Sequence, residues 1–229
     1  MKFLYLMMRT IILAGFYILS SIELVAQVPV SKEPRHHVVF TNEKVRILNV
    51  LLPPGDTTQY HVHSTPSLFI SLTKTNTSWQ LINKEPVSNI SVAGYIWFEN
   101  LNPPHTKTHR VWNNDTSVYH VMDVEILAKD SGFSSGPLTI AHGRLLIDTP
   151  WVRTYAIKLA KNEEVTIKEQ PSDFILVSIN DAMIRLTENK TGSTPFVKPG
   201  QFYYIRAKDT FGVVNRGDTP ANFALVEIK

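Results

Sequence analysis

The chain has 229 residues, of which 43% are hydrophobic and 19% charged, and its formal net charge is +3. This composition supports a buried core and excludes a disordered chain, and the small positive excess without a dense Lys/Arg run argues against nucleic-acid or membrane-surface partners. The absence of cysteine excludes disulfides, thiolate metal ligands and cysteine nucleophiles.

Residues 1–26 have the pattern of a secretory signal peptide. Lys2 and Arg9 flank the start, an apolar run covers residues 10–20, and small residues lead to Ala26. This order of charged, apolar and small residues is typical of exported proteins. We expect cleavage after Ala26 and a secreted or periplasmic protein of a bacterium that is not bound to the membrane. The alternative is an uncleaved membrane anchor, for which the apolar run is short.

The rest of the sequence is dominated by strand patterns. Short segments rich in β-branched and aromatic residues alternate with turn clusters of Pro, Gly, Asn and Asp. The segments are 38–40, 45–51, 67–72, 118–126, 174–179 and 223–228. No stretch has a long helical period of apolar residues, so the pattern predicts an all-β fold, as a sandwich or a barrel.

The two halves of the sequence after residue 26 match each other at several points. The matching pairs are Val45-Arg46 with Val152-Arg153, Asn113 with Asn215, and Val124–Ile126 with Val226–Ile228. These matches predict a duplication with units at residues 36–129 and 143–229, and residues 130–137 read as a Gly- and Ser-rich linker. Because the asparagines are retained in both units, we expect them to serve a turn.

Two histidines in the first unit have the spacing of metal ligands. His61 and His63 stand at i and i+2, and on a strand this spacing directs both imidazoles to the same face. Two such imidazoles can chelate one ion, because imidazole is a good ligand for Zn, Cu, Fe and Ni. A third ligand must come from elsewhere in the fold. A bare His-x-His is more often a pair that binds nothing, so the flanking residues must show whether this pair binds a metal.

The flanking residues resemble the two sequence motifs of the cupin superfamily. The matching residues are Gly55, His61 and His63 in the first motif, and Pro104, His109 and Asn113 in the second, with Thr106 in a position where the family has Gly. The resemblance implies two tandem antiparallel jelly-roll barrels, a bicupin. It also implies a divalent metal ion, one of Fe, Mn, Zn or Ni, on His61, His63 and His109. It leaves the reaction and the catalytic residues open, because cupins serve many functions.

One position departs from the family pattern. The acidic ligand of the first motif would fall at Ser67 or Leu68, and neither residue is acidic. A metal held by three neutral imidazoles would keep its full +2 charge, which favours an anionic or chelating small molecule and lowers the pKa of a bound water. Three-His cupins that resemble this pattern include dioxygenases with non-haem iron. The alternative is that the loss of the acid marks a weakened or lost metal site.

Two further residues are candidate pocket or fourth-ligand neighbours. Ser67 stands where the acidic ligand is missing, and His120 lies on a predicted strand, residues 117–126. The alternatives are a plain strand serine and a histidine that faces away. We expect His105, in a Pro-Pro-His turn, and the pair His36-His37 to be exposed to solvent.

The second unit lacks the histidines of the first. Lys168, Gln170 and Phe211 fill the positions that align with His61, His63 and His109. The sequence therefore predicts that the second unit binds no metal and provides packing or a wall of the pocket. A separate small-molecule cavity there is the alternative.

Three functions remain open from the sequence. The first is a metal-dependent enzyme acting on a small molecule, such as a dioxygenase or an isomerase. The second is a non-catalytic binding or structural module that uses the barrel mouth. The third is an extracellular interaction protein in which the metal only braces the barrel. We expect a monomer or a homodimer in each case.

Overall fold

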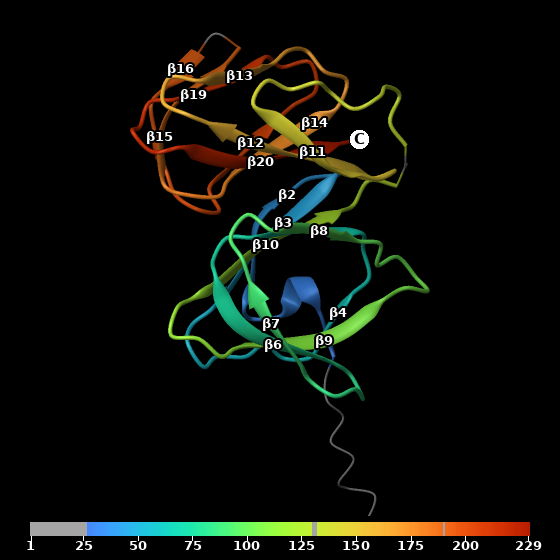
Figure 1. Cartoon of the computed structure of the whole chain (residues 1–229). Coiled ribbons are helices and arrows are strands. Elements are labelled where there is room, and N and C mark those ends of the chain that lie inside the picture. Colours follow the sequence, from blue (N-terminus) through green and yellow to red (C-terminus); the bar gives the residue numbers. More distant parts are fainter. Residues whose placement is uncertain (1–26, 130–131, 190) are drawn as a thin grey trace, which may run out of the picture.

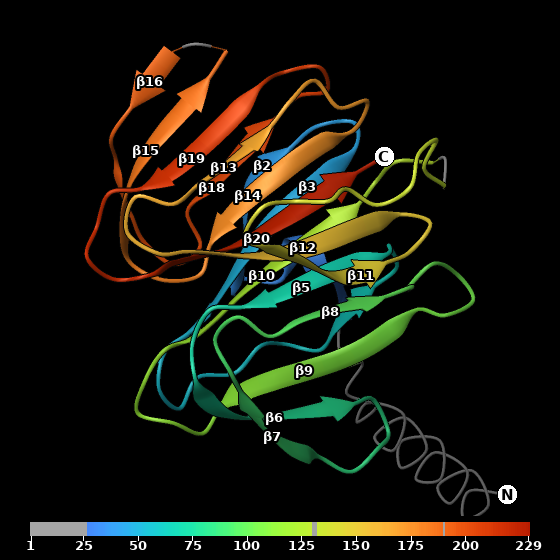
Figure 2. The ribbon, with the colours of Figure 1, turned by 45° about the horizontal axis from the view of Figure 1, so that its top comes forward.

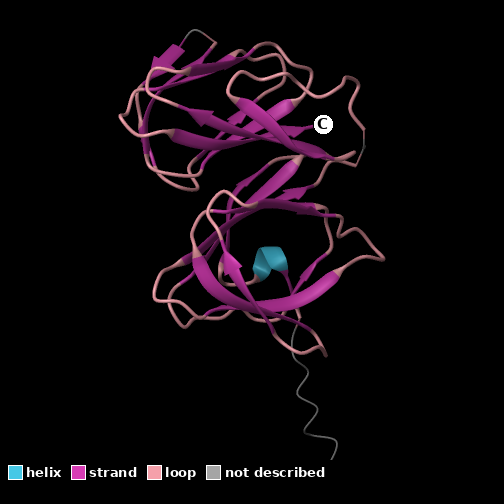
Figure 3. Ribbon diagram, viewed as in Figure 1, coloured by secondary structure: helices cyan, strands magenta, loops and turns pink. Residues whose placement is uncertain are grey.

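The computed structural model describes residues 27–129, 132–189 and 191–229, and the predicted signal peptide lies outside them. Within these residues the chain is made of strands and one 3-10 helix, η2 (Val30–Lys32), which confirms the predicted all-β class (Figures 1 and 3). No helix in the described part of the chain is both long and apolar enough to cross a membrane.

Four sheets hold the strands, two in each half of the chain. Sheet A contains β1 (Val28–Pro29), β4 (His61–His63), β9 (Lys107–Asn113), β6 (Thr75–Leu81) and β7 (Val87–Ser91). Sheet B contains β2 (His36–Thr41), β3 (Val45–Leu52), β10 (Tyr119–Ile126), β5 (Ser67–Ser71) and β8 (Ile96–Glu99). The strands are given in their spatial order, and all neighbours are antiparallel except β1 and β4, which are parallel.

The second half has the same division into two sheets. Sheet C contains β11 (Gly143–Asp148), β12 (Val152–Leu159), β20 (Ala221–Ile228), β14 (Asp173–Ser178) and β18 (Phe202–Ile205). Sheet D contains β13 (Glu164–Ile167), β19 (Phe211–Asn215), β15 (Ala182–Glu188) and β16 (Thr191–Ser193), and β17 (Phe196–Val197) pairs with β15. Sheets A and B form the first sandwich and sheets C and D the second.

The four sheets stack in the order A, B, C, D, as Figures 1 and 2 show. The strands of sheets A and B do not join into one closed sheet within the described residues, nor do those of C and D. Each half is therefore an open sandwich, where we expected a closed barrel. The strands of the first sandwich span 28–126, because β1 and η2 also join it, and those of the second span 143–228. The duplication of the two halves stays a prediction.

Sheets B and C share an apolar core that joins the two sandwiches. Along β10, Met122, Val124 and Ile126 point out of the first sandwich because alternate residues of a strand face opposite sides. They pack in one cluster with residues of β12, β14 and β20. Aromatic contacts close its edges, such as Phe40 on Tyr204, with ring centroids 4.9 Å apart. The other face of β10 is left to line the interior of the first sandwich.

The two matched asparagines make the same turn in each sandwich. Asn113 Nδ2 donates to the carbonyls of Leu52 and Ser117 at 3.0 and 2.7 Å. Asn215 makes two equivalent bonds in the second sandwich, at 3.0 and 2.8 Å. Both side chains are buried, at 1% and 0% exposed. The predicted turn role of these residues is confirmed.

The registers of the two halves correct the sequence alignment by one residue. His61 pairs with His109 across β4 and β9, and Ile167 pairs with Phe211 across β13 and β19. The residue that corresponds to His61 is therefore Ile167, where we expected Lys168. A shift of one residue exchanges the two faces of a strand, and Lys168 is accordingly exposed.

The shift arises in the turn before each strand. Gly55 and Asn162 both have positive φ, 73° and 64°, and open equivalent turns. From Gly55 the chain takes six residues to reach His61, and from Asn162 it takes five to reach Ile167. The second turn is thus one residue shorter.

Candidate metal centre

The three predicted ligands come together between sheets A and B. His61 and His63 lie on the inner face of β4, at 0% and 2% exposed, and β9 places His109 directly opposite His61. The ring centroid of His109 lies 4.6 Å from that of His61 and 5.1 Å from that of His63. The Nε2 atoms of His63 and His109 are 3.1 Å apart.

This last distance suits two ligands of one ion. Two nitrogens that each lie about 2.1 Å from a metal are about 3.0 Å apart at a right angle and about 3.4 Å apart at the tetrahedral angle. The separation of 3.1 Å between the Nε2 atoms of His63 and His109 falls between these values.

A fourth histidine joins the cluster from the opposite sheet. His36 is the first residue of β2 in sheet B, and it is buried at 7% exposed. Its ring centroid is 4.5 Å from that of His61. One ring nitrogen from each of His36, His61 and His63 lies within 4.8 Å of the others. The expectation of an exposed His36 is therefore wrong, whereas His37, on the other face of the strand, is exposed as predicted.

Hydrogen bonds set the tautomers of two of these rings. His61 Nδ1 lies 2.9 Å from the carbonyl oxygen of Gln59, so Nδ1 carries the proton. His36 Nδ1 lies 2.7 Å from Oε2 of Glu33 and carries its proton for the same reason. In each ring the lone pair is then on Nε2, which is the arrangement that a metal-binding histidine needs.

Several buried polar atoms of the cluster have no hydrogen-bond partner in the described part of the chain. They are His61 Nε2, His63 Nδ1, His109 Nδ1 and both carboxylate oxygens of Asp123. Asp123 is fully buried on β10, and its Oδ2 is 3.6 Å from His63 Nδ1, beyond hydrogen-bond distance. An unpartnered buried polar group costs about 1–3 kcal/mol. The unpartnered Nε2 of His61, beside the paired Nε2 atoms of His63 and His109, fits a divalent cation, so the residues present fit the metal that the motifs imply.

The protonation states also suit a cation. Burial, with a further contribution from His36, lowers the pKa of His61 to about 4. Burial and the neighbouring histidines hold the pKa of His63 and His109 well below the ordinary value. The rings are thus neutral at neutral pH. Burial and the nearby Glu125 raise the pKa of Asp123 well above its usual range, which favours the neutral acid, so the case for a cation rests on the imidazoles.

The position of the missing acidic ligand is occupied by side chains that serve other contacts. Ser67 is buried on β5, and its hydroxyl donates to the carbonyl of Thr65 at 3.1 Å. Leu68 points the other way, into the core between sheets B and C. No acid therefore enters the cluster from β5.

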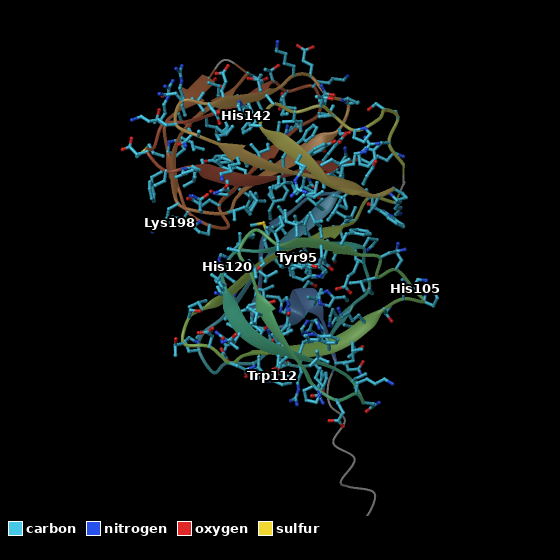
Figure 4. All side chains as sticks on the ribbon, viewed as in Figure 1. Tyr95, His105, Trp112, His120, His142 and Lys198 are labelled. Carbon is cyan, nitrogen blue, oxygen red and sulfur yellow. The ribbon has the colours of Figure 1, made fainter. Side chains whose placement is uncertain are left out.

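The candidate His120 lies outside the cluster. Its neighbours Tyr119 and Val121 line the interior, so His120 points to the opposite side of β10. There its Nε2 is 3.3 Å from Oδ1 of Asn49, and its ring packs against Gly200 of the second half. Figure 4 shows His120 at the side of the first sandwich that faces the second, and shows His105 in an outer loop. His120 as a neighbour of the metal is thus wrong.

A pocket leads from the cluster to the surface. Its volume is about 510 Å³, and its walls come from β6, β7, β8, β9 and β10. A smaller cavity of about 60 Å³ adjoins it and is lined by His36, His63 and His109. His109 lines both, so His36, His63 and His109 stand at the inner end of the pocket.

The walls of the pocket are aromatic and carry one ion pair. Trp97 stacks between Phe69 and Tyr95, with centroids 4.9 and 5.6 Å away. Lys107 Nζ lies 2.9 Å from each carboxylate oxygen of Glu99, and Trp97 Nε1 donates to Glu99 at 3.1 Å. Glu99 thereby holds the ammonium group in the pocket. The sequence analysis missed this pair, although Lys107 stands two residues before His109 on the same face of β9.

Comparisons with known proteins point to one fold. No protein-family model matches the chain, and no curated protein matches its sequence. Among solved structures, AerE from Microcystis aeruginosa is similar, with a TM-score of 0.58 and 12% identity over 86% of this chain and 98% of that one. A cupin 2 conserved barrel domain protein from Leptotrichia buccalis has a TM-score of 0.52 and 13% identity over 84% and 87% of the two chains.

A third similar structure is that of an enzyme. Salicylate 1,2-dioxygenase from Pseudaminobacter salicylatoxidans has a TM-score of 0.59 and 10% identity, over 81% of this chain and 71% of that one. These likenesses show the fold: the protein has the cupin fold, as the two sequence motifs predict. Within that fold, the chain has a buried histidine cluster at the end of an aromatic pocket.

Proposed function

We propose that the chain binds one divalent metal ion on His61, His63 and His109 and uses it on a small molecule held in the adjoining pocket. One observation carries the proposal: three buried, neutral imidazoles meet, with the Nε2 atoms of His63 and His109 3.1 Å apart and His61 Nε2 without a partner in the described residues. The metal is one of Fe, Mn, Zn or Ni, because imidazole ligands alone do not discriminate among them. The reaction is the metal-assisted oxygenation or isomerisation of the bound molecule.

The metal would supply a Lewis acid with a position open to a ligand from the pocket. The residues of the chain bind and orient that ligand. Lys107 offers a positive charge whose place is fixed by Glu99, and it lies 5.6 Å from the ring centroid of Trp79. Tyr95, which is exposed and lines the pocket, offers a flat apolar surface. Burial raises the pKa of Tyr119, so its phenol stays protonated and can donate a hydrogen bond.

These features favour an aromatic anion as the ligand. A planar ring would stack on Tyr95, which lines the pocket, and its negative group would lie near Lys107. The similar salicylate dioxygenase has also been crystallised with gentisate, and both molecules are aromatic acids. We propose a ligand of this chemical class.

We further propose that the protein is exported and acts outside the cytoplasm, on the strength of the charged, apolar and small-residue order of residues 1–26. We also propose that the two sandwiches form a duplicated pair, a bicupin. The second unit would have lost its ligands, since Ile167 and Phe211 stand where the first has His61 and His109.

The metal content of protein purified without a histidine tag tests the proposal. We expect about one metal ion per chain by mass spectrometry after reconstitution, and below about 0.2 per chain the proposal fails. The variant His61→Ala should lose the metal. The matched control is His105→Ala, which removes an exposed histidine from an outer loop and should keep it.

A second candidate is a non-catalytic binding module. The observation in its favour is that β5 contributes no acidic ligand, since Ser67 and Leu68 make other contacts. Such a module would bind aromatic acids equally well before and after treatment with a chelator. Loss of binding on chelation would count against this metal-independent module, and turnover of the bound acid with the metal present decides for the enzyme.

A further inference from the structure

A buried carboxylate stands directly behind the histidine cluster. Glu33 follows η2 and is 2% exposed. Its Oε2 accepts the Nδ1 proton of His36 at 2.7 Å and the backbone N–H of Arg35 at 2.7 Å. Its Oε1 accepts the backbone N–H of Gln59 at 3.1 Å. No metal-binding motif includes this residue.

The same carboxylate orients two rings of the cluster. It holds His36 directly, through Nδ1. It also holds the backbone of Gln59, whose carbonyl accepts the Nδ1 proton of His61. Both rings are thereby turned with Nε2 away from their hydrogen-bond partners, and these nitrogens are the ones left for a cation.

The charge of Glu33 is directed to the cluster. The guanidinium of Arg35, two residues further along the chain, is paired with Asp56 at 2.7 Å. Within the described residues the ion-pair partner of Glu33 is His36. The negative charge therefore lies one imidazole away from the place of the proposed metal.

We propose that His36 is a fourth ligand of the metal, and that Glu33, acting through His36, supplies the negative charge that the acidic ligand of the first motif would supply. This inference rests on the proposed function, because it needs a metal on His61, His63 and His109. A carboxylate that hydrogen-bonds to a ligating histidine fixes its tautomer and makes the imidazole a stronger donor. Glu33 thus takes the place of the carboxylate that is missing at Ser67, with the imidazole of His36 between it and the ion.

The affinity for zinc and cobalt(II) tests the role of Glu33. The variant Glu33→Gln keeps the size of the side chain and removes its charge. We expect it to bind either metal about 10- to 100-fold more weakly, measured by competition with a chromophoric chelator. The matched control is Glu85→Gln, which removes an exposed carboxylate of the first sandwich away from the cluster and should keep wild-type affinity.

The absorption spectrum of the cobalt(II) protein tests the role of His36. The variant His36→Ala should change the position and intensity of the ligand-field bands, because one nitrogen leaves the shell, while the metal remains bound more weakly. His36→Gln serves as a second variant if the alanine variant does not fold. Thermal melting of the metal-free proteins identifies any variant that has lost its fold.

The outcomes are distinct. A wild-type protein that takes up no metal overturns the proposed function, and this inference with it. A wild-type protein that binds metal, with unchanged affinity in Glu33→Gln and an unchanged cobalt spectrum in the His36 variants, overturns this inference alone. Weaker binding in Glu33→Gln together with an altered spectrum in the His36 variants supports it.

Discussion

The two sandwiches share their strand pairing and differ in what they hold inside. Across β4 and β9 the first sandwich places His61 opposite His109, and across β13 and β19 the second places Ile167 opposite Phe211. The first interior contains a histidine cluster and a pocket of about 510 Å³. The second is filled by seventeen buried apolar residues, against five in the corresponding cluster of the first. One arrangement of strands can thus serve as a core or as a site.

The comparison also shows where the first sandwich obtains its stability. A cavity and unpartnered polar groups contribute little to the free energy of folding. The apolar core between sheets B and C lies on the other side of the same strands, and it contains Ile47, Ile70 and Val124 from the first sandwich. We infer that the second sandwich stabilises the first across this boundary and so permits a polar interior.

The largest expected effect is in the packed interior. Phe211→Ala removes a ring that is 1% exposed, and it should lower the free energy of unfolding by about 3–5 kcal/mol, measured by urea denaturation. His109→Ala, at the matching position of the first sandwich, should lower it much less in metal-free protein, because His109 lines a cavity. Equal losses in the two variants would contradict the contrast between core and site.

A smaller effect is expected on removal of the metal. A metal at about 100 times its Kd adds about 2.7 kcal/mol to the free energy of unfolding, so a chelator should lower the melting temperature of the wild-type protein. His109→Ala should remove this difference. A substitution in the second sandwich, such as Phe211→Leu, should keep the difference in melting temperature between the metal-bound and the chelator-treated protein. A loss of this difference in Phe211→Leu would show that the metal is not confined to the first sandwich.

The shared turn should respond alike in both halves. Asn113→Ala and Asn215→Ala each leave one buried and one part-buried carbonyl without this donor, and each should lower the free energy of unfolding by about 2 kcal/mol. The two losses should agree to within the error of urea denaturation. A loss confined to Asn113 would mean that this residue serves the site and not the turn.

The smallest expected effect is the response to acid. The pKa of His61 is lowered to about 4 in the folded protein, so below its ordinary value the unfolded chain binds a proton that the folded chain excludes. Stability is then lost as the pH falls from the ordinary histidine pKa towards the folded value. For His61 the loss in metal-free protein should be about 0.7 kcal/mol between pH 7 and pH 6.

The variant His61→Leu should show a weaker dependence on pH over the same range in urea denaturation. The variant His37→Ala, which changes an exposed histidine, should behave as the wild type. A pH dependence that His61→Leu leaves unchanged would mean that other groups carry it.

The sequence predicted the fold and the centre of the site because both depend on local patterns. The spacing of His61 and His63 sets their common face, and the second motif places His109 on a strand. His36 was missed because it lies on sheet B and meets the other histidines only where sheets A and B pack face to face. The packing of one sheet on another cannot be predicted from the spacing of residues along one strand. The only nearby signal is Glu33, three residues before it, which by itself reads as a surface acid.

Two other errors of the sequence analysis concern which face of a strand a residue lies on. His120 was placed near the metal because it lies on the right strand, but the odd-numbered neighbours Tyr119 and Val121 face the interior. Lys168 was aligned with His61 because the shorter turn after Asn162 shifts the register by one. The face to which a residue points depends on where its strand begins. A turn that is shorter by one residue therefore moves every residue of the following strand to the opposite face.

The apolar boundary between sheets B and C has a consequence for any attempt to divide the chain. Its two faces are joined by the 16 residues 127–142, which give each sandwich a partner at an effective concentration in the millimolar range. The covalent connection thus keeps the two sandwiches associated at any protein concentration. A fragment ending at residue 129 would expose Leu68, Ile70 and Met122 to water, and it should then self-associate or aggregate.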